Sequence, residues 1–144
     1  MSNQVNIKGV EVSTDHYIDG KRVSSEKKFS VINPNNPSEV LAEVSRGDDG
    51  IAQLAVDAAR KGFNVWSEMT VDERSHIMHK LADLIEARAE KFTQFETIDN
   101  GKPLTIARAV NVALVIDHFR YYAGMATKIH GETIDISVPY SPSA

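Results

Sequence analysis

The chain has 144 residues, of which 42% are apolar and 25% charged, a balance typical of a globular domain that can bury a core. Its formal net charge of −4 argues against a general nucleic-acid or anionic-membrane surface, which needs an excess of positive charge. Cysteine is absent, so the sequence encodes no disulfide, no thiolate metal ligand and no cysteine nucleophile. The sequence shows no basic segment followed by an apolar one, as a secretory leader would have, and no apolar run approaches the roughly 20 residues that span a bilayer. We therefore expect a soluble cytoplasmic protein.

The first part of the chain is expected to be poor in helix. Residues 1–15 are polar, and we expect them to form a flexible N-terminal arm. Within 16–23, Asp19 and Gly20 predict a tight turn between two strands, because both residue types tolerate positive φ. A second hairpin is expected between residues 29 and 44, where two apolar runs flank a stretch dense in Asn and Pro.

Three helical segments are expected to follow. Asp48 or Asp49 can serve as N-cap of the first helix and favours the positive end of its dipole. The apolar residues from 51 to 66 recur at three- and four-residue spacing, which predicts one narrow apolar stripe. Thr70 and Glu73 have the spacing of a capping box and predict the start of the second helix.

The second helix has an apolar face for which we expect burial, whereas the apolar faces of 51–66 and 104–126 are expected to lack the sheet that would cover them. In the second helix this face consists of Ile77, Leu81, Leu84 and Ile85. A break is expected near Arg88, and Gly101, which is followed by a proline, is expected to end the segment. A third helix is predicted over 103–128, with a face marked by Ile106, Val110, Ala113, Leu114, Asp117, Tyr121 and Met125. A short strand is predicted over 133–136.

Few residues have the pattern of a functional site. His76 and His79 are one helical turn apart and can supply two metal ligands, but no carboxylate or cysteine stands at a matching position. A solvated helix face is therefore favoured over a metal site there. Gly-x-Ser-x-Gly, Gly-x-Gly-x-x-Gly and the P-loop pattern are all absent from the sequence. Asp99 lies in the last turn of a helix, where the dipole disfavours an acid. It indicates either a nearby cation or buried partner, or a carboxylate that caps neighbouring backbone N–H groups.

One segment near the middle of the chain is more specific. The stretch ETIDNGKPL, from Glu96 to Leu104, resembles a hallmark of the aldehyde dehydrogenase superfamily. Further matches in the family's order and spacing are YIDGKRV at 17–23, VINPNNPSEVLAEV at 31–44, AARKGFNVW at 58–66, ERSHIMHKLADLIEARAE at 73–90, FRYYAG at 119–124 and KIHGETI at 128–134. The resemblance covers about residues 16–136, and several consecutive matches in register make it highly specific.

The resemblance implies an α/β fold, the opening part of a Rossmann-like NAD(P)-binding domain, with residues 16–144 as its incomplete N-terminal portion. It also implies NAD(P)-dependent oxidation of an aldehyde to a carboxylic acid by a cysteine thiolate, with a glutamate that activates water. Those family residues lie downstream of the aligned region. We therefore assign no catalytic or cofactor-binding residue, and expect the isolated chain to be inactive and to bind neither NAD nor NADP.

The resemblance extends to a metal site and to partners. Some family members hold a monovalent cation, and the transferred ligands here are Asp99 and the main-chain carbonyl of Val31 or Ile32. A homo-oligomer or a full-length relative is the expected partner, with no nucleic acid and no membrane. The alternative function is a non-catalytic interaction or oligomerisation module, and a helical metal-binding protein that uses His76 and His79 is a third hypothesis.

Overall fold

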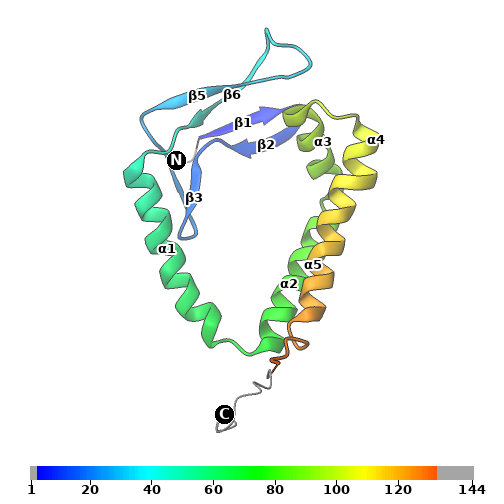
Figure 1. Ribbon diagram of the computed structural model, residues 1–144. Coiled ribbons are helices and arrows are strands. Elements are labelled where there is room, and N and C mark those ends of the chain that lie inside the picture. Colours follow the sequence, from blue (N-terminus) through cyan, green and yellow to red (C-terminus); the bar gives the residue numbers. More distant parts are fainter. Residues whose placement is uncertain (1–2, 133–144) are drawn as a thin grey trace, which may run out of the picture.

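The structure, a computed structural model, describes residues 3–132 and is a mixed α/β arrangement of hairpins followed by helices (Figure 1). The strands are β1 (Gln4–Ile7), β2 (Val10–Ser13), β3 (His16–Ile18), β4 (Lys21–Val23), β5 (Lys28–Ile32) and β6 (Val40–Ser45). The helices are α1 (Asp49–Glu68), α2 (Val71–Glu86), α3 (Ala89–Asn100), α4 (Leu104–Ile106), the π-helix η1 (Ala107–Val112) and α5 (Ala113–Met125). The strand predicted over 133–136 lies outside the described residues.

The N-terminal residues form a hairpin where we expected a flexible, irregular arm. Strands β1 and β2 pair antiparallel, with Val5 opposite Val12. The turn between them has Lys8 at φ 48° and Gly9 at φ 87°, the pair of positive values that a tight two-residue hairpin turn needs. The alternating valines and isoleucine of this segment were the available signal, and the surrounding polar residues obscured it. The expectation of an irregular arm was wrong for the described residues.

The other two hairpins confirm the turn chemistry. Strands β3 and β4 pair across Asp19 at φ 51° and Gly20 at φ 73°. Strands β5 and β6 form the second expected hairpin, whose register shifts between Val31 and Ile32. Each hairpin is a separate two-stranded sheet, so the described part of the chain contains no larger sheet on which helices pack.

A buried carboxylate connects the first and last hairpins. Asp15 accepts hydrogen bonds from the backbone N–H of Asn3 at 2.8 Å and from the Asn3 side-chain amide at 2.9 Å. The hydroxyl of Ser45, at the end of β6, lies 3.4 Å from the same carboxylate. The backbone N–H of Ser45 also donates to the carbonyl of Thr14 at 3.0 Å. These bonds hold the pKa of Asp15 below its ordinary value of 3.8, with the Asn3 side chain as the largest cause.

The helix boundaries follow the predicted capping residues. Asp48 is the N-cap of α1, and its carboxylate accepts from the N–H of Ile51. Thr70 and Glu73 form the capping box at the start of α2. The predicted break falls between α2 and α3, at Arg88. Gly101 ends α3 in the left-handed conformation, which a side chain would disfavour.

The core lies between α2 and α5, which run side by side (Figure 1). Its buried residues are Ala82, Val112 and Ile116, with Ile85, Ala89 and Phe119 packed around them. Polar contacts flank this core. The hydroxyl of Ser75 donates to the carbonyl of Ala123 at 2.8 Å. Arg120 forms ion pairs with Glu86 at 2.5 Å and Asp83 at 2.9 Å, which raise the pKa of its guanidinium.

The apolar face of α2, which was predicted to be buried, is largely exposed, and those of α1 and α5, which were expected to lack a covering sheet, are exposed as well. In α2, Ile77, Leu81 and Leu84 keep 39–45% of their surface exposed, and only Ile85 of the predicted face packs on the core. In α5, Leu114 is 47% exposed, because Val112 and Ile116 face α2 instead. Helix α1 has no buried residue. The predicted faces were correctly identified as apolar, but no described element covers them.

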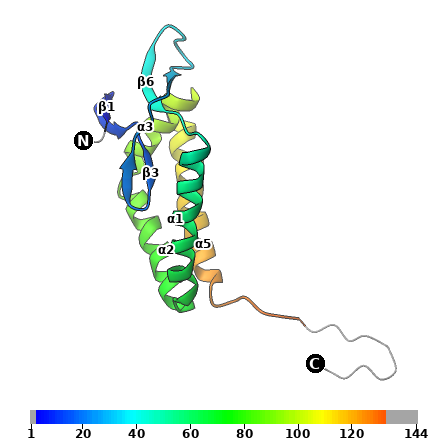
Figure 2. The same cartoon turned by 90° about the vertical axis from the view of Figure 1, so that its left-hand side faces the viewer.

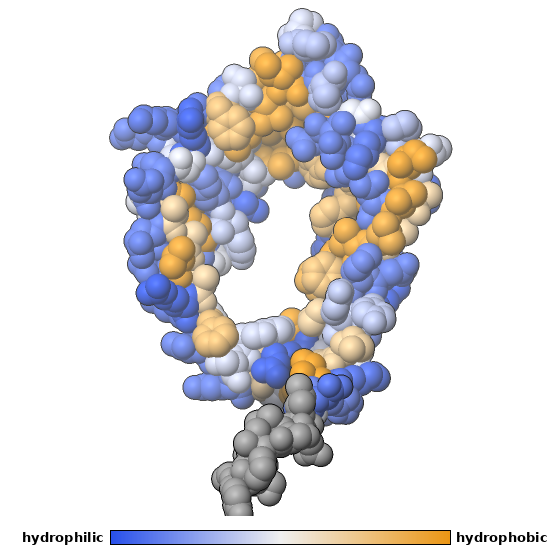
Figure 3. Space-filling model, viewed as in Figure 1, coloured by the Kyte–Doolittle hydropathy of each residue, from blue (hydrophilic) through white to orange (hydrophobic). Residues whose placement is uncertain are grey.

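These exposed faces surround an opening. Figure 3 shows a gap through the molecule between α1 and the α2–α5 pair, with apolar side chains gathered along both sides. Viewed from the side, the elements lie in a flat layer rather than around a common centre (Figure 2). No helix of the described part is long and apolar enough to cross a membrane.

We predict that the isolated chain self-associates or unfolds with weak cooperativity. Exposed apolar surface costs about 25 cal/mol per Å² relative to its burial, which favours association. Light scattering across a range of protein concentrations and thermal unfolding by calorimetry check this. A concentration-independent monomer with a single sharp transition would contradict it.

We also predict that acid loosens the contact between the N-terminal and β5–β6 hairpins. Because the pKa of Asp15 is lowered in the folded state, its carboxylate stabilises the fold above the ordinary value of 3.8, and this contribution is lost as the pH falls through the lowered value. The protection of the amides of residues 3–15, which is their exchange rate relative to the unstructured rate at the same pH, should fall in that acid range. The Asp15→Asn variant should have lower protection at neutral pH and show little further loss in acid; unchanged wild-type protection would refute the prediction.

Candidate functional site

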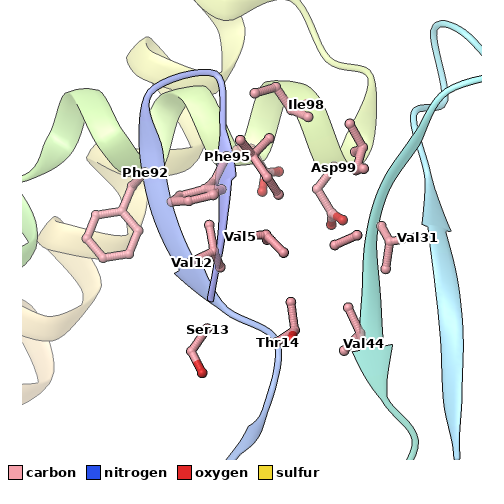
Figure 4. A pocket seen from close by; sticks show the side chains of 14 residues that line it. Val5, Val12, Ser13, Thr14, Val31, Val44, Phe92, Phe95, Ile98 and Asp99 are labelled. Atoms are coloured by element: carbon pink, nitrogen blue, oxygen red, sulfur yellow. The ribbon is translucent and has the colours of Figure 1, made fainter. Parts of the chain in front are cut away.

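The pocket of greatest interest lies between the β1–β2 hairpin, the β5–β6 hairpin and α3 (Figure 4). Its volume is about 300 Å³. Most of its lining is apolar, contributed by valines of four strands and by Phe92 and Phe95 of α3. The polar groups among its lining residues are Ser13, Thr14, Glu96 and Asp99. The pocket thus combines an apolar wall with two carboxylates from one helix.

Asp99 lies in the last turn of α3, and its carboxylate is directed into this pocket (Figure 4). Val31 of β5 lines the same pocket, whereas Ile32 does not and is 50% exposed. Within residues 3–132 the Asp99 carboxylate accepts no hydrogen bond, so the alternative in which it caps backbone N–H groups does not hold there. The N–H of Gly101 instead donates to the carbonyl of Thr97 at 3.0 Å.

The C-terminal end of α3 lies close to the turn that follows β5. A Cβ atom on Gly101 would lie 3.2 Å from Cγ of Pro34 and 3.4 Å from Oδ1 of Asn35, so the glycine permits the contact as well as the positive φ. The turn is fixed by buried Asn33, whose Oδ1 accepts from the N–H of Asn35 at 3.0 Å. The two motif segments that hold Asp99 and Val31 therefore meet for a steric reason.

Glu96 is the residue that the sequence did not single out. Its Oε1 accepts from Lys102 Nζ at 2.8 Å and from the side-chain amides of Asn100 and Asn111 at 3.1 Å each. The pKa of Glu96 lies below its ordinary value, and the hydrogen bond from Lys102 is the largest cause. Burial raises this pKa and offsets part of that effect. Glu96 also lines a second pocket of about 220 Å³ beside Phe92. Asn111 belongs to η1, and the sequence carries no signal for a π-helix.

The histidine pair has no further metal ligands within the described residues 3–132. His76 and His79 both lie exposed on α2. Among residues 3–132, no group of three His, Cys, Asp or Glu side chains is placed to hold a metal ion. The structure thus provides the pair with no complete coordination site in the described region.

The starts of α1 and α2 do not fit the phosphates of a dinucleotide. Phosphates bind at helix N-termini where backbone N–H groups are free and no acid repels them. At the start of α1, the Asp48 carboxylate accepts from a backbone N–H and Asp49 lies in the first turn. At the start of α2, the Glu73 carboxylate accepts from a backbone N–H and Asp72 lies in the first turn. The sequence also lacks a glycine-rich phosphate loop. We therefore derive no catalytic step through a nicotinamide cofactor from these residues.

Comparisons with known proteins agree with the fold and the motifs. The model of the aldehyde dehydrogenase family matches residues 21–143. The chain is 38% identical to aldehyde dehydrogenase family 2 member C4 of Arabidopsis thaliana over 128 residues, which is 86% of this chain and 25% of that protein. It is 41% identical to the mitochondrial aldehyde dehydrogenase of Homo sapiens over 115 residues, 78% of this chain and 22% of that protein.

A solved structure shares the arrangement of the elements. The NAD+ complex of aldehyde dehydrogenase from Bacillus cereus aligns with a TM-score of 0.78 and 43% identity, over 84% of this chain and 25% of that chain. The hairpins and helices are thus those of the N-terminal part of a dehydrogenase's cofactor-binding domain. The chain belongs to the aldehyde dehydrogenase family. It spans about a quarter of the length of the relatives that it matches.

Proposed function

We propose that the chain is the N-terminal portion of an NAD(P)-dependent aldehyde dehydrogenase, an enzyme that oxidises an aldehyde to a carboxylic acid. The support is the family match over residues 21–143 together with the matched arrangement of hairpins and helices. The proposal includes a cytoplasmic location and assembly with copies of itself or with a full-length relative. These 144 residues alone are proposed to be inactive and to bind neither NAD nor NADP.

The inactivity follows from the chemistry of the residues present. A thiolate is the nucleophile that the family resemblance implies, and the sequence contains no cysteine. Serine and threonine hydroxyls need a neighbouring base to act as nucleophiles, and the sequence shows no such motif. A chain without the nucleophile and without a phosphate-binding loop has no route to hydride transfer.

We predict no formation of reduced nicotinamide when the purified chain is mixed with NAD+ or NADP+ and a panel of aliphatic and aromatic aldehydes. The measurement is the absorbance of the reduced cofactor, with the Bacillus cereus aldehyde dehydrogenase as positive control. Aldehyde-dependent turnover that co-purifies with the chain would overturn the claim of inactivity.

We further propose that the pocket beside α3 binds a monovalent cation through Asp99 and the main-chain carbonyl of Val31 or Ile32. The support is the position of the Asp99 carboxylate, which is directed into the pocket and accepts no hydrogen bond from the described residues. Val31 is favoured over Ile32 as carbonyl donor because it lines the pocket and Ile32 does not. A carboxylate and a carbonyl are hard oxygen ligands suited to such an ion.

We predict that K+ or Na+ produces saturable amide chemical-shift changes near residues 31 and 99, measured by NMR at constant ionic strength against choline chloride. The Asp99→Ala variant should lose these changes. Asp117→Ala, which removes an exposed aspartate of α5, is the matched control and should retain them. Equal responses of the two variants would reject Asp99 as a ligand.

The alternative function, a non-catalytic interaction module, has its own support. Large apolar side chains are exposed on α1, α2 and α5, including Val65 at 61% and Tyr121 at 63%. Contiguous exposed apolar surface of this kind marks an interaction site in a soluble protein. The two functions share this surface, and they differ in whether the assembled complex oxidises an aldehyde.

A further inference from the structure

Asn100 and Gly101 form a chemically labile pair at the end of α3. Asn100 is the only asparagine of the sequence that precedes a glycine. Asparagine is a thermolabile residue, because the backbone nitrogen of the next residue can attack its side-chain carbonyl carbon. A glycine in that next position has no Cβ atom to hinder the attack. Asn100 is also exposed, so water can reach it. The pair is thus a candidate for spontaneous modification.

The modification is a deamidation that needs no enzyme. The backbone nitrogen of Gly101 loses its proton and bonds to Cγ of Asn100. The bond from Cγ to Nδ2 breaks, ammonia leaves with that proton, and a cyclic imide remains. Water then opens either C–N bond of the imide, which leaves aspartate or isoaspartate at position 100. No electron is transferred, and water is the only co-reactant.

The folded end of α3 holds the reacting atoms away from one another. The N–H of Gly101 donates to the carbonyl of Thr97 at 3.0 Å, so the attacking nitrogen keeps its proton in a helical hydrogen bond. The side-chain amide of Asn100 donates to Oε1 of Glu96, four residues earlier, at 3.1 Å. This bond turns the side chain back toward the start of the helix and away from the Gly101 nitrogen. The last turn must therefore open before the nitrogen can attack.

Glu96 is fixed by residues outside α3. Its Oε1 also accepts from Nζ of Lys102 at 2.8 Å and from the side-chain amide of Asn111, in η1, at 3.1 Å. These contacts keep the carboxylate in place when the last turn of α3 frays. Helix ends open locally at a much lower free energy than the whole fold. The contact between Glu96 and Asn100 thus controls how often Asn100 becomes reactive.

We propose that Asn100 is a site of spontaneous deamidation in this protein, gated by the opening of the last turn of α3, and that Glu96 keeps this gate closed. Glu96 is a positioning residue, because it acts through the Asn100 side chain and touches neither bond that changes. The reaction uses only this turn and water, so it is independent of the proposed dehydrogenase activity.

The products alter the contact between α3 and the turn that follows β5. A carboxylate at position 100 cannot donate to Glu96 and repels it. Isoaspartate also adds a methylene group to the main chain directly before Gly101, whose Cβ position lies 3.2 Å from Cγ of Pro34. Either product therefore weakens the left-handed cap at Gly101. Since Asp99 is the neighbouring residue, deamidation also disturbs the pocket that Asp99 lines.

The test follows the fraction of chain that is deamidated at Asn100 during incubation at mildly alkaline pH. Peptide mass spectrometry locates both products, and a synthetic peptide of residues 96–104 gives the rate without the fold. The folded chain should react roughly tenfold or more slowly than the peptide, because the helix end is open for only a small part of the time. In urea the chain should react at the rate of the peptide.

Two alanine variants of α3 test the role of Glu96. Glu96→Ala should raise the rate at Asn100 about fivefold, since it removes the hydrogen bond that holds the side chain. Glu90→Ala is the matched control in the first turn of the same helix, about 15 Å from Asn100 along the axis. The Glu90 carboxylate is exposed and pairs with Arg108, so this variant should leave the rate unchanged. Circular dichroism should show equal helix content in both variants.

Three results would overturn parts of the proposal. Deamidation of the folded chain as fast as the peptide means that α3 does not gate the reaction. No product at Asn100 in the wild type and in Glu96→Ala, over the period in which the peptide is converted, rejects the site itself. Equal rates for Glu96→Ala and Glu90→Ala reject Glu96 as the positioning residue. If Glu96→Ala fails to fold, the comparison of the wild-type chain with and without urea still decides whether the gate exists.

Discussion

The packing of the helices on one side only determines most other properties of this structure. The α2–α5 contact closes over small residues, with Ala82 and Ala123 at 0% and 1% exposure, so the helices approach closely. Ile85, Ile116 and Phe119 pack in that seam, but most other large apolar side chains of both helices are left outside it. Since burial of large side chains supplies most of the hydrophobic stabilisation, the seam orders the helix pair but contributes little to a global core. Local devices such as caps, tight turns and the Asp15 hydrogen bonds then carry a larger share of the order.

The contrast between strong local contacts and a small core explains which features could be predicted from the sequence. Thr70 with Glu73, Asp19 with Gly20, and Gly101 are each determined by neighbours within a few residues, and all three were predicted correctly. The β1–β2 hairpin was missed because its apolar alternation is short and is embedded among polar residues. Burial was predicted unevenly, because the lack of cover on α1 and α5 was expected, whereas the burial expected for Ile77, Leu81 and Leu84 of α2 was wrong. An apolar face indicates that something should cover the helix, but it does not indicate that the cover lies within the same 144 residues.

The candidate site was predictable in part. The family resemblance named Asp99 and the carbonyls near the Asn-Pro turn, and the structure supplies the reason that the two segments meet, the close contact of Gly101 with Pro34. Glu96 escaped notice because its partners are not at helical spacing. Lys102 reaches it from beyond the end of α3, and Asn111 from another helix. Contacts of this kind depend on the path of the chain rather than on any local pattern.

The π-helix η1 links the site to the face of α5. A π-turn contains one more residue than an α-turn, so it shifts the helical phase of everything after it by about 100°. The sequence predicted one continuous face through Ile106, Val110 and Leu114, whereas Val112 and Ile116 occupy the core. The change of face begins before η1, because Ile106 is already 47% exposed while Ala107 is fully buried, and the extra residue adds to it. The same turn carries Asn111, whose amide bonds to Glu96 at 3.1 Å. Because π-helices are rare and strained, a side-chain contact that holds one helps to keep it. The bond from Asn111 to Glu96 thus ties the π-helical turn to α3 at the point where the core positions pass from Ala107 to Val112 and Ile116.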